Sequence, residues 1–169
     1  MLSLYYKLRS KVAIGWSKYF PKSYKKFTLS NTRVWEGPIN NSLQKPLSQC
    51  RVALLTSAGV HLQNDAPFNV ETLDGDHSYR IIPPDTQHSE LKATHIYYDT
   101  KHANIDISIV FPLEQLKELE GHSIHAVSNC NFGLNGGTLN HEPHEKITAP
   151  KVADILKKDR VDIAFLVPG

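Results

Sequence analysis

The chain has 169 residues, of which 40% are hydrophobic and 21% are charged, and its formal net charge is +2. This length suits one globular domain that buries roughly 70% of the surface its unfolded form exposes, so folding requires neither a disulfide nor a metal ion. The two cysteines, Cys50 and Cys130, have no CxxC or zinc-ligand spacing. They therefore exclude a disulfide framework and favour a reducing, cytoplasmic location.

The N-terminal arm, residues 1–33, differs in charge from the rest of the chain. It holds eight Lys or Arg and no acid, whereas the other 136 residues hold eleven basic and seventeen acidic side chains, a formal charge of −6. Apolar residues recur in the arm at intervals of three or four, which predicts a basic amphipathic helix; they are Tyr5, Leu8, Val12, Trp16 and Tyr19. Such a helix either packs on the domain or extends into solvent, and the alternative is contact with a partner or an anionic membrane surface.

The arm is not expected to direct secretion, to span a membrane or to bind nucleic acid. Its longest apolar run, residues 12–16, is too short for a signal peptide or a membrane span. Nucleic-acid binding is disfavoured because the excess of basic residues does not continue beyond the arm.

A polar, proline-containing linker over residues 34–48 is expected to separate the arm from a folded domain over residues 49–169. The apolar run 51–57 predicts a buried strand, and Ala58-Gly59 predicts the turn after it. His61 would then lie on the first loop beyond the end of a strand.

The remaining elements alternate between strands and helices. Residues 62–90 form a long irregular segment with a turn at Asp74-Gly75 and a short extended piece at 78–82. We expect a strand at 93–98, a weaker strand or helix start at 105–110, a helix from Pro112 to Gly121, a strand at 124–128, a Gly/Asn-rich loop at 129–138, a helix at 149–158 and a strand at 161–167. This order predicts an α/β layered domain, with a mostly parallel sheet flanked by helices.

No motif in the sequence specifies a metal or a cofactor. The nine histidines have neither HExxH nor cysteine partners at zinc-ligand spacing, so we expect no protein-bound metal and no cofactor. A metal-dependent hydrolase is the weakest of the functions considered. The strand end Thr56-Ser57-Ala58-Gly59 matches no nucleophile or phosphate-binding motif, which favours a structural turn.

Charged and imidazole side chains follow the first strand and the turns after it. They are His61, Asp76, His77, Arg80, His95, Asp99 and Asp106. If the fold brings them to one edge of the sheet, they could clamp a small molecule that carries a carboxylate or an amine. Structural ion pairing explains each of them equally well.

Several longer strings carry a family resemblance. They are RVALLTSAGVH (51–61), APFN (66–69), GDHSYRIIP (75–83), THIYYDT (94–100), DISIVFPLEQLKEL (106–119) and VDIAFLVP (161–168). In order and spacing they resemble the selenoprotein B subunits of glycine, sarcosine and betaine reductases, a family that includes a D-proline reductase subunit and short homologues. The resemblance covers about residues 46–169 and leaves out the arm.

The resemblance implies reductive cleavage of a carbon–nitrogen bond by a selenolate or thiolate, with partner proteins that receive the adduct. Other reductase subunits or a second copy of the chain are the expected partners. The pocket for a small carboxylate or amine substrate is expected to be lined by His61, Asp76, Arg80, His95, Asp99 and Asp106.

The reactive residue of this family follows the strand that corresponds to residues 161–167, and this sequence ends at Gly169. We therefore expect that the redox residue is absent from these 169 residues, either because a UGA codon for selenocysteine was read as a stop or because the product is naturally short. The rival hypothesis is a non-catalytic binding or assembly protein, held at a membrane surface by the arm.

Overall fold

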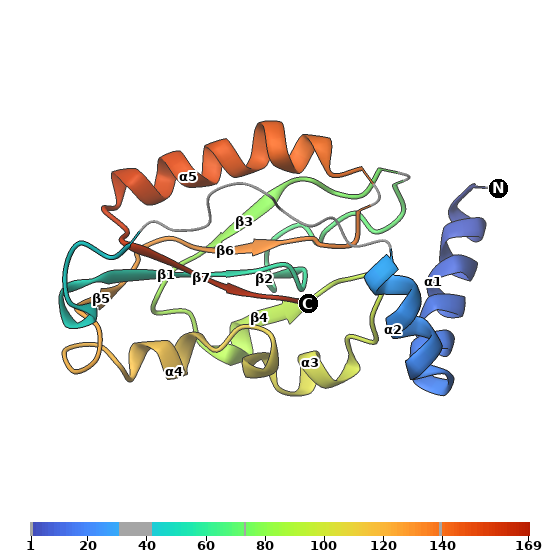
Figure 1. Cartoon of the computed structure of the whole chain (residues 1–169), viewed down its shortest axis with the longest axis horizontal. Coiled ribbons are helices and arrows are strands. Elements are labelled where there is room, and N and C mark those ends of the chain that lie inside the picture. The colour runs from blue at the N-terminus through green and yellow to red at the C-terminus, as the bar shows by residue number, and fades with distance from the viewer. Residues whose placement is uncertain (1, 31–41, 73, 139) are drawn as a thin grey trace.

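The computed structural model describes residues 2–30, 42–72, 74–138 and 140–169, and most of them form a three-layered α/β domain. A five-stranded sheet is covered by α5 (Ala149–Lys158) on one face, and by α3 (Lys101–Ile105) and α4 (Leu113–Lys117) on the other (Figure 1). The predicted fold class is confirmed.

The central strand is β1 (Arg51–Thr56), which is buried from Val52 onward. It pairs in parallel with β7 (Ile163–Val167) on one side and with β5 (Ala126–Val127) and β6 (Asn131–Leu134) on the other. The strand β3 (Tyr79–Ile82) adds an antiparallel partner to β6. A separate two-stranded ribbon, β2 (Val60–Leu62) with β4 (Leu91–Ala93), lies beside the sheet.

The two sides of the sheet are packed unequally. The larger core cluster includes Leu54, Ile82 and Phe111, and it joins the sheet to the ribbon and to α4. The smaller cluster joins Ala53, Leu55 and Phe132 to Val152 of α5. Parallel strands need apolar residues on both faces, and β1 meets this requirement from both clusters.

Four expectations about regular structure are corrected. The predicted strand at 93–98 ends at Ala93, because the side chain of Asn104 hydrogen-bonds both the N–H and the C=O of that residue, at 2.8 and 3.0 Å. His61 lies within β2 and not on a loop. Residues 129–138 contain the buried strand β6, and the strand expected at 124–128 shrinks to β5.

Other expectations are confirmed. The helix at 149–158 and the extended piece at 78–82 are present. The helix after Pro112 is also present but ends at Lys117, before the predicted end at Gly121, which has a positive φ of 71°. The segment 105–110 takes its helical alternative, since α3 ends at Ile105 and a 3-10 turn, Ile107–Ile109, follows. A π-helical turn, His144–Thr148, precedes α5, and two further 3-10 turns occur at Leu47–Gln49 and His88–Glu90.

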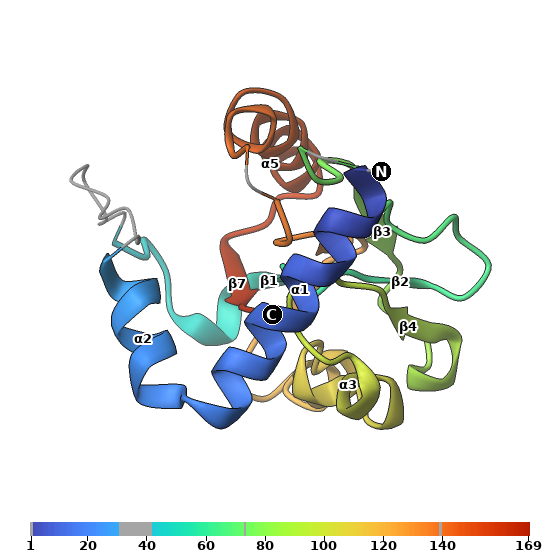
Figure 2. The same ribbon diagram turned by 90° about the vertical axis from the view of Figure 1, so that its right-hand side faces the viewer.

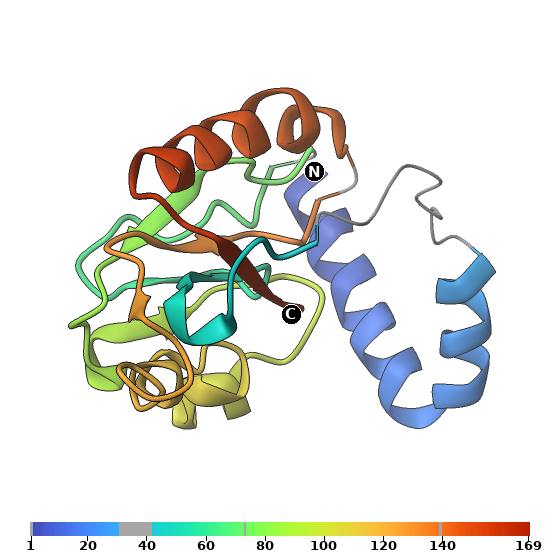
Figure 3. The ribbon, with the colours of Figure 1, turned by 60° about the vertical axis from the view of Figure 1, so that its left-hand side comes forward.

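The arm forms two helices where we expected one. The helix α1 (Leu2–Tyr19) is followed by α2 (Pro21–Ser30), and the two lie side by side as a hairpin at the end of the sheet where the parallel strands finish (Figures 2 and 3). We refer to residues 2–30 as the hairpin and to residues 42–169 as the body. Residues 31–41 lie outside the described residues, and they include residues 34–41 of the predicted linker.

Candidate functional site

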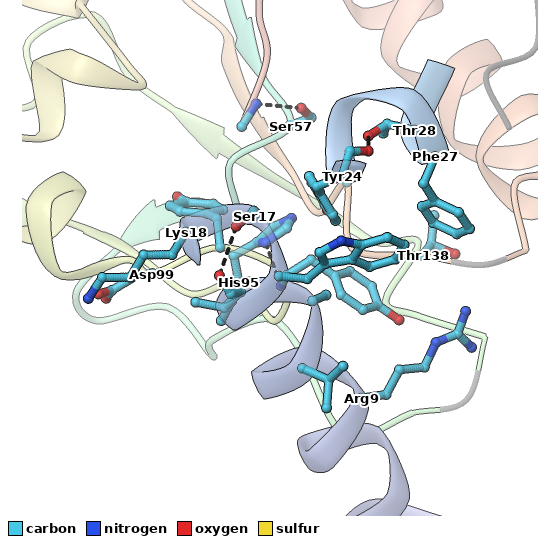
Figure 4. A pocket seen from close by; sticks show the side chains of 18 of the residues that line it. Arg9, Ser17, Lys18, Tyr24, Phe27, Thr28, Ser57, His95, Asp99 and Thr138 are labelled. Atoms are coloured by element: carbon cyan, nitrogen blue, oxygen red, sulfur yellow. Dashed lines mark hydrogen bonds between the residues drawn. The ribbon is translucent and has the colours of Figure 1, made fainter. Parts of the chain in front are cut away.

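A cavity of about 1030 Å³ lies between the hairpin and the carboxyl ends of β1, β6 and β7. We call it the carboxyl-end cavity. Figure 4 shows Ser57, His95 and Thr138 of the body and Arg9, Lys18 and Tyr24 of the hairpin around this space. In open α/β sheets ligands bind in the crevice beyond the carboxyl ends of the strands, so its position is that of a functional site.

Ser57 forms the floor of the cavity and joins the three strand ends. Its N–H donates to the Val167 carbonyl at 3.2 Å and its carbonyl accepts from Gly136 N–H at 2.8 Å. Its hydroxyl oxygen accepts from Gly169 N–H at 3.0 Å. The serine therefore has the structural role that its sequence context predicts.

His95 forms one wall, in the loop after β4. Its Nδ1 accepts a hydrogen bond from Tyr97 N–H at 3.1 Å, and burial lowers the pKa of the ring to about 4. At neutral pH the ring is uncharged, and because Nδ1 is an acceptor, the proton resides on Nε2. His95 is thus a neutral hydrogen-bond donor in the cavity wall.

Tyr98 supports this histidine. The two ring centroids are 4.6 Å apart, and the phenol donates to the Ala58 carbonyl at 2.8 Å. Burial raises the pKa of Tyr98 to about 12, so the phenol keeps its proton. A Cβ at Gly137 would lie 3.0 Å from Ile96 Cγ2 and 3.4 Å from His95 Nε2, so Gly137 leaves the room that this loop occupies.

The hairpin supplies the opposite wall. Trp16 of α1 packs on Tyr24 and Phe27 of α2, with ring centroids 5.6 and 5.0 Å apart, and its indole N–H donates to Ser23 Oγ at 3.1 Å. Arg9 and Lys18 also line the cavity. The site therefore combines cations and aromatic faces from the hairpin with Asp99 and the neutral His95 from the body.

Comparison with known proteins places this chain in a family. A sequence model of the glycine/sarcosine/betaine reductase selenoprotein B family matches residues 32–168. The chain belongs to this family. It is also 36% identical to the D-proline reductase subunit gamma of Acetoanaerobium sticklandii over 134 residues, which cover 78% of this chain and 54% of that protein.

The chain thus spans about half the length of this curated relative. No solved structure matches the chain. Apart from Gly169, the body residues of the cavity lie inside the region matched by the selenoprotein B family, whereas the hairpin residues lie outside it.

Two of the six side chains predicted to bind substrate line the carboxyl-end cavity. They are His95 and Asp99, both in the loop that follows β4. Asp99 also accepts a hydrogen bond from Lys101 N–H at 3.0 Å, which fixes the start of α3. Their role in substrate binding stays a prediction.

His61 lies behind this loop and is 1% exposed. Its Nδ1 and Nε2 are 2.7 Å from the Leu62 carbonyl and 2.9 Å from Thr94 Oγ1. Since Thr94 directly precedes His95, His61 holds the cavity loop from the interior of the protein.

Asp76 and Arg80 belong to a second polar cluster, around the loop before β3. The Arg80 guanidinium lies 4.5 Å from the Phe68 ring centroid and donates to the Ala66 carbonyl and Ser78 Oγ at 3.0 and 2.8 Å. Burial alone would raise the pKa of Asp76, but hydrogen bonds from Ser78 and Asn69 lower it below its usual value. This cluster links Ala66, Asn69 and Ser78 and does not line the cavity.

Asp106, the sixth predicted side chain, is exposed and caps the turn at 107–109 by accepting from Ser108 N–H at 3.0 Å. The structure therefore does not bring all six residues to one place. Sequence reasoning did not select Tyr98, Gly136 or the hairpin as parts of the cavity. The adjacent tyrosines of THIYYDT and the Gly136-Gly137 pair were the available signals.

Neither cysteine lies at the carboxyl ends of the strands: Cys50 is at the amino end of β1, and the register of β6 places Cys130 beside the middle of β1. Cys50 and Cys130 directly precede β1 and β6, and burial, followed by the charge of Asp159, raises the pKa of the Cys130 thiol. Neither is the thiolate of a carboxyl-end site. Within the described ranges no group of three His, Cys, Asp or Glu side chains is arranged to hold a metal, and no helix is long and apolar enough to cross a membrane.

Proposed function

We propose that this member of the selenoprotein B family binds a small amino acid or its N-methylated relative in the carboxyl-end cavity, as a subunit of a reductase that cleaves a carbon–nitrogen bond. The observation that carries the proposal is the position of His95 and Asp99. Both lie in the family-matched region and beside the cations of the hairpin, at the sheet edge where ligands bind.

The cavity offers a group for each end of such a substrate. Arg9, Lys18 and the Nε2–H of His95 suit a carboxylate, since hydrogen bonds to an ionised group are about twice as strong as neutral ones. The Asp99 carboxylate and the face of Tyr98 suit an ammonium group. Because His95 is neutral, it donates a directed hydrogen bond without adding a third positive charge beside Arg9 and Lys18.

In the proposed reaction a selenolate or thiolate attacks the carbon next to the carboxylate. A Se–C or S–C bond forms as the C–N bond breaks, and the amine leaves with the bonding electrons and takes a proton. Thiols of partner proteins then supply two electrons and release the reduced acid. The positions of Cys50 and Cys130 support a nucleophile that is neither of them.

Binding tests the first half of this proposal. We expect proline, glycine, sarcosine or betaine to bind in isothermal titration calorimetry. His95→Phe should weaken binding five- to tenfold, because it removes one hydrogen bond of about 1 kcal/mol while it keeps a ring against Tyr98. His125→Phe, at an exposed histidine outside the cavity, is the matched control. Failure of all four compounds to bind, or equal effects of the two variants, would contradict the proposal.

Catalysis is tested on the whole native gene product with a dithiol reductant and the same four compounds. Amine release, or ring opening of proline, is the expected result. Tight binding without any turnover would favour the second candidate, a non-catalytic binding subunit. The observation that favours this alternative is the distance of both cysteines along the strands from the cavity.

A further inference from the structure

The hairpin has an excess of positive charge that the body does not share. Residues 1–33 hold eight basic side chains and no acid, and the formal charge of the other 136 residues is −6. Three of the lysines, Lys22, Lys25 and Lys26, are exposed on one face of α2 because they are spaced at i, i+3 and i+4. The positive electrostatic field of these three lysines is therefore concentrated on one face of α2.

The same hairpin exposes apolar side chains that the body leaves uncovered. Leu4 and Leu8 lie four residues apart on α1 and are 75% and 61% exposed, and neither lines the carboxyl-end cavity. Tyr19 and Phe20 add exposed apolar surface at the turn between the helices, and Leu29 adds more near the end of α2. Eight of the seventeen exposed large apolar side chains identified in the described residues belong to this hairpin.

Exposed apolar side chains beside lysines are typical of helices that lie in a membrane interface. There the apolar side chains enter the acyl boundary, and lysine stems reach back to anionic headgroups. We propose that the α1–α2 hairpin docks on an anionic lipid surface. This role goes beyond the proposed reductase function, although Arg9 and Lys18 of the same hairpin also line the carboxyl-end cavity.

Charge favours lipid over a symmetric contact between two hairpins, because two basic surfaces repel each other. An anionic membrane attracts the hairpin and repels the acidic body, so the two parts orient the molecule with the hairpin toward the lipid. Because Arg9, Trp16 and Tyr24 also line the carboxyl-end cavity, docking places the hairpin wall of that cavity next to the headgroups.

Vesicle flotation tests the proposal on the full chain. We expect binding to equimolar phosphatidylcholine and phosphatidylglycerol, weaker binding in high salt, and at least tenfold weaker binding to phosphatidylcholine alone. Each lysine near an anionic surface strengthens binding roughly fivefold, so the triple variant Lys22→Glu, Lys25→Glu and Lys26→Glu should lose about a hundredfold or more. None of the three lines the cavity.

Two matched controls test whether binding depends on the hairpin surface, and not on net charge or on exposed apolar side chains elsewhere. Lys151→Glu, Lys157→Glu and Lys158→Glu make the same charge change on exposed positions of α5 and should leave binding within twofold. Leu4→Gln with Leu8→Gln should weaken binding at least tenfold, whereas Ile105→Gln with Ile109→Gln, at body residues 75% and 60% exposed, should not. Circular dichroism checks that each variant is folded.

Other outcomes overturn the proposal. Equal binding to both kinds of vesicle, or equal losses in the hairpin and control variants, would show that the hairpin does not recognise anionic lipid. Absence of vesicle binding combined with dimers in light scattering that the leucine variant dissociates would assign this surface to a second copy.

Discussion

The two ends of β1 are built from different chemistry. Its amino end is closed by carboxylates: Asp162 accepts from Arg51 N–H at 2.7 Å and pairs with Lys45 at 2.8 Å. Next to it, Asp159 accepts from Ser128 Oγ and Asn129 N–H at 2.6 and 2.8 Å. Charged acceptors on strand N–H groups are among the stronger hydrogen bonds in proteins.

The carboxyl end is held by backbone contacts instead. Gly59 N–H donates to the Leu134 carbonyl at 2.8 Å, and Thr94 N–H donates to the Gly59 carbonyl at 2.9 Å. These contacts use no charged side chain. The charged side chains near this end, Asp99, Arg9 and Lys18, line the cavity instead. One end of the strand therefore holds the sheet together, while the other end is available for binding.

The strongest destabilisation is expected at the carboxyl end. Gly59 has a φ of 74°, and a Cβ there would lie 2.0 Å from the Thr94 carbonyl oxygen. Gly59→Ala should therefore lower the free energy of unfolding by at least about 3 kcal/mol in urea denaturation. Gly121→Ala is the control, because Gly121 has a φ of 71° and a Cβ there would meet no atom within 4 Å; it should cost only about 1 kcal/mol. Equal costs would mean that the close approach to Thr94 is unimportant.

At the amino end, Asp159→Ala should lower the free energy of unfolding by about 2 kcal/mol at neutral pH, because buried Ser128 and the Asn129 N–H lose a charged acceptor. Burial alone would raise the pKa of Asp159, but the hydrogen bonds from Ser128 and Asn129 outweigh it and hold the pKa below its usual value of 3.8. The stabilisation is therefore present above that value and is lost as the pH falls below it.

Acid titration of the unfolding free energy checks this sign. The wild type should approach Asp159→Ala in stability only below pH 3.8. Asp154→Ala, an exposed aspartate of α5, should stay within about 0.5 kcal/mol of the wild type throughout. A gap that closed near neutral pH would argue against a carboxylate that caps the strands.

At the carboxyl end, the free energy of unfolding should depend on pH through His95, in a higher pH range than at the amino end. Burial lowers the pKa of His95 from 6.5 to about 4, so the unfolded chain binds a proton in this window and the folded chain does not. Stability is complete above 6.5 and is lost as the pH falls toward 4. We expect His95→Phe to remove about 2 kcal/mol of that pH dependence, after allowance for the part of the ring that water reaches.

The burial of His144 also lowers its pKa. This contribution is common to both proteins, so the difference between wild type and His95→Phe isolates the cavity histidine. Identical pH slopes in the two proteins would show that the ring is solvated and not part of a buried wall.

Much of the fold could be predicted because local pattern and burial agree. The run 51–57 has a continuous apolar centre, residues 52–55, and forms the buried β1, and the period of Val152, Ile155 and Leu156 places α5 on the sheet. The strand β6 was missed because Asn131 and Gly133 have low strand propensity.

Tertiary contacts account for both of these residues of β6. Asn131 accepts from Leu54 N–H at 2.8 Å in the core, and a Cβ at Gly133 would lie 1.7 Å from the Val60 carbonyl oxygen. Only the crossing of β2 over β6 explains this glycine, and no local pattern encodes such a crossing.

The site could be predicted only in part for a related reason. His95 and Asp99 share one short loop, so sequence proximity keeps them together, whereas His61, Asp76 and Asp106 were grouped by residue type alone. The hairpin side of the cavity depends on how residues 2–30 pack against strand ends that are distant in sequence.

The edge strand β7 has a consequence for handling the protein in solution. Among the described residues it pairs only with β1, and it exposes Phe165 and Leu166 at 47% and 68%. A flat apolar edge of this kind templates strand addition from a neighbouring molecule. Aggregation of these 169 residues should therefore increase steeply with protein concentration. Leu166→Lys would place a charge on this strand and should reduce fibril-like assembly.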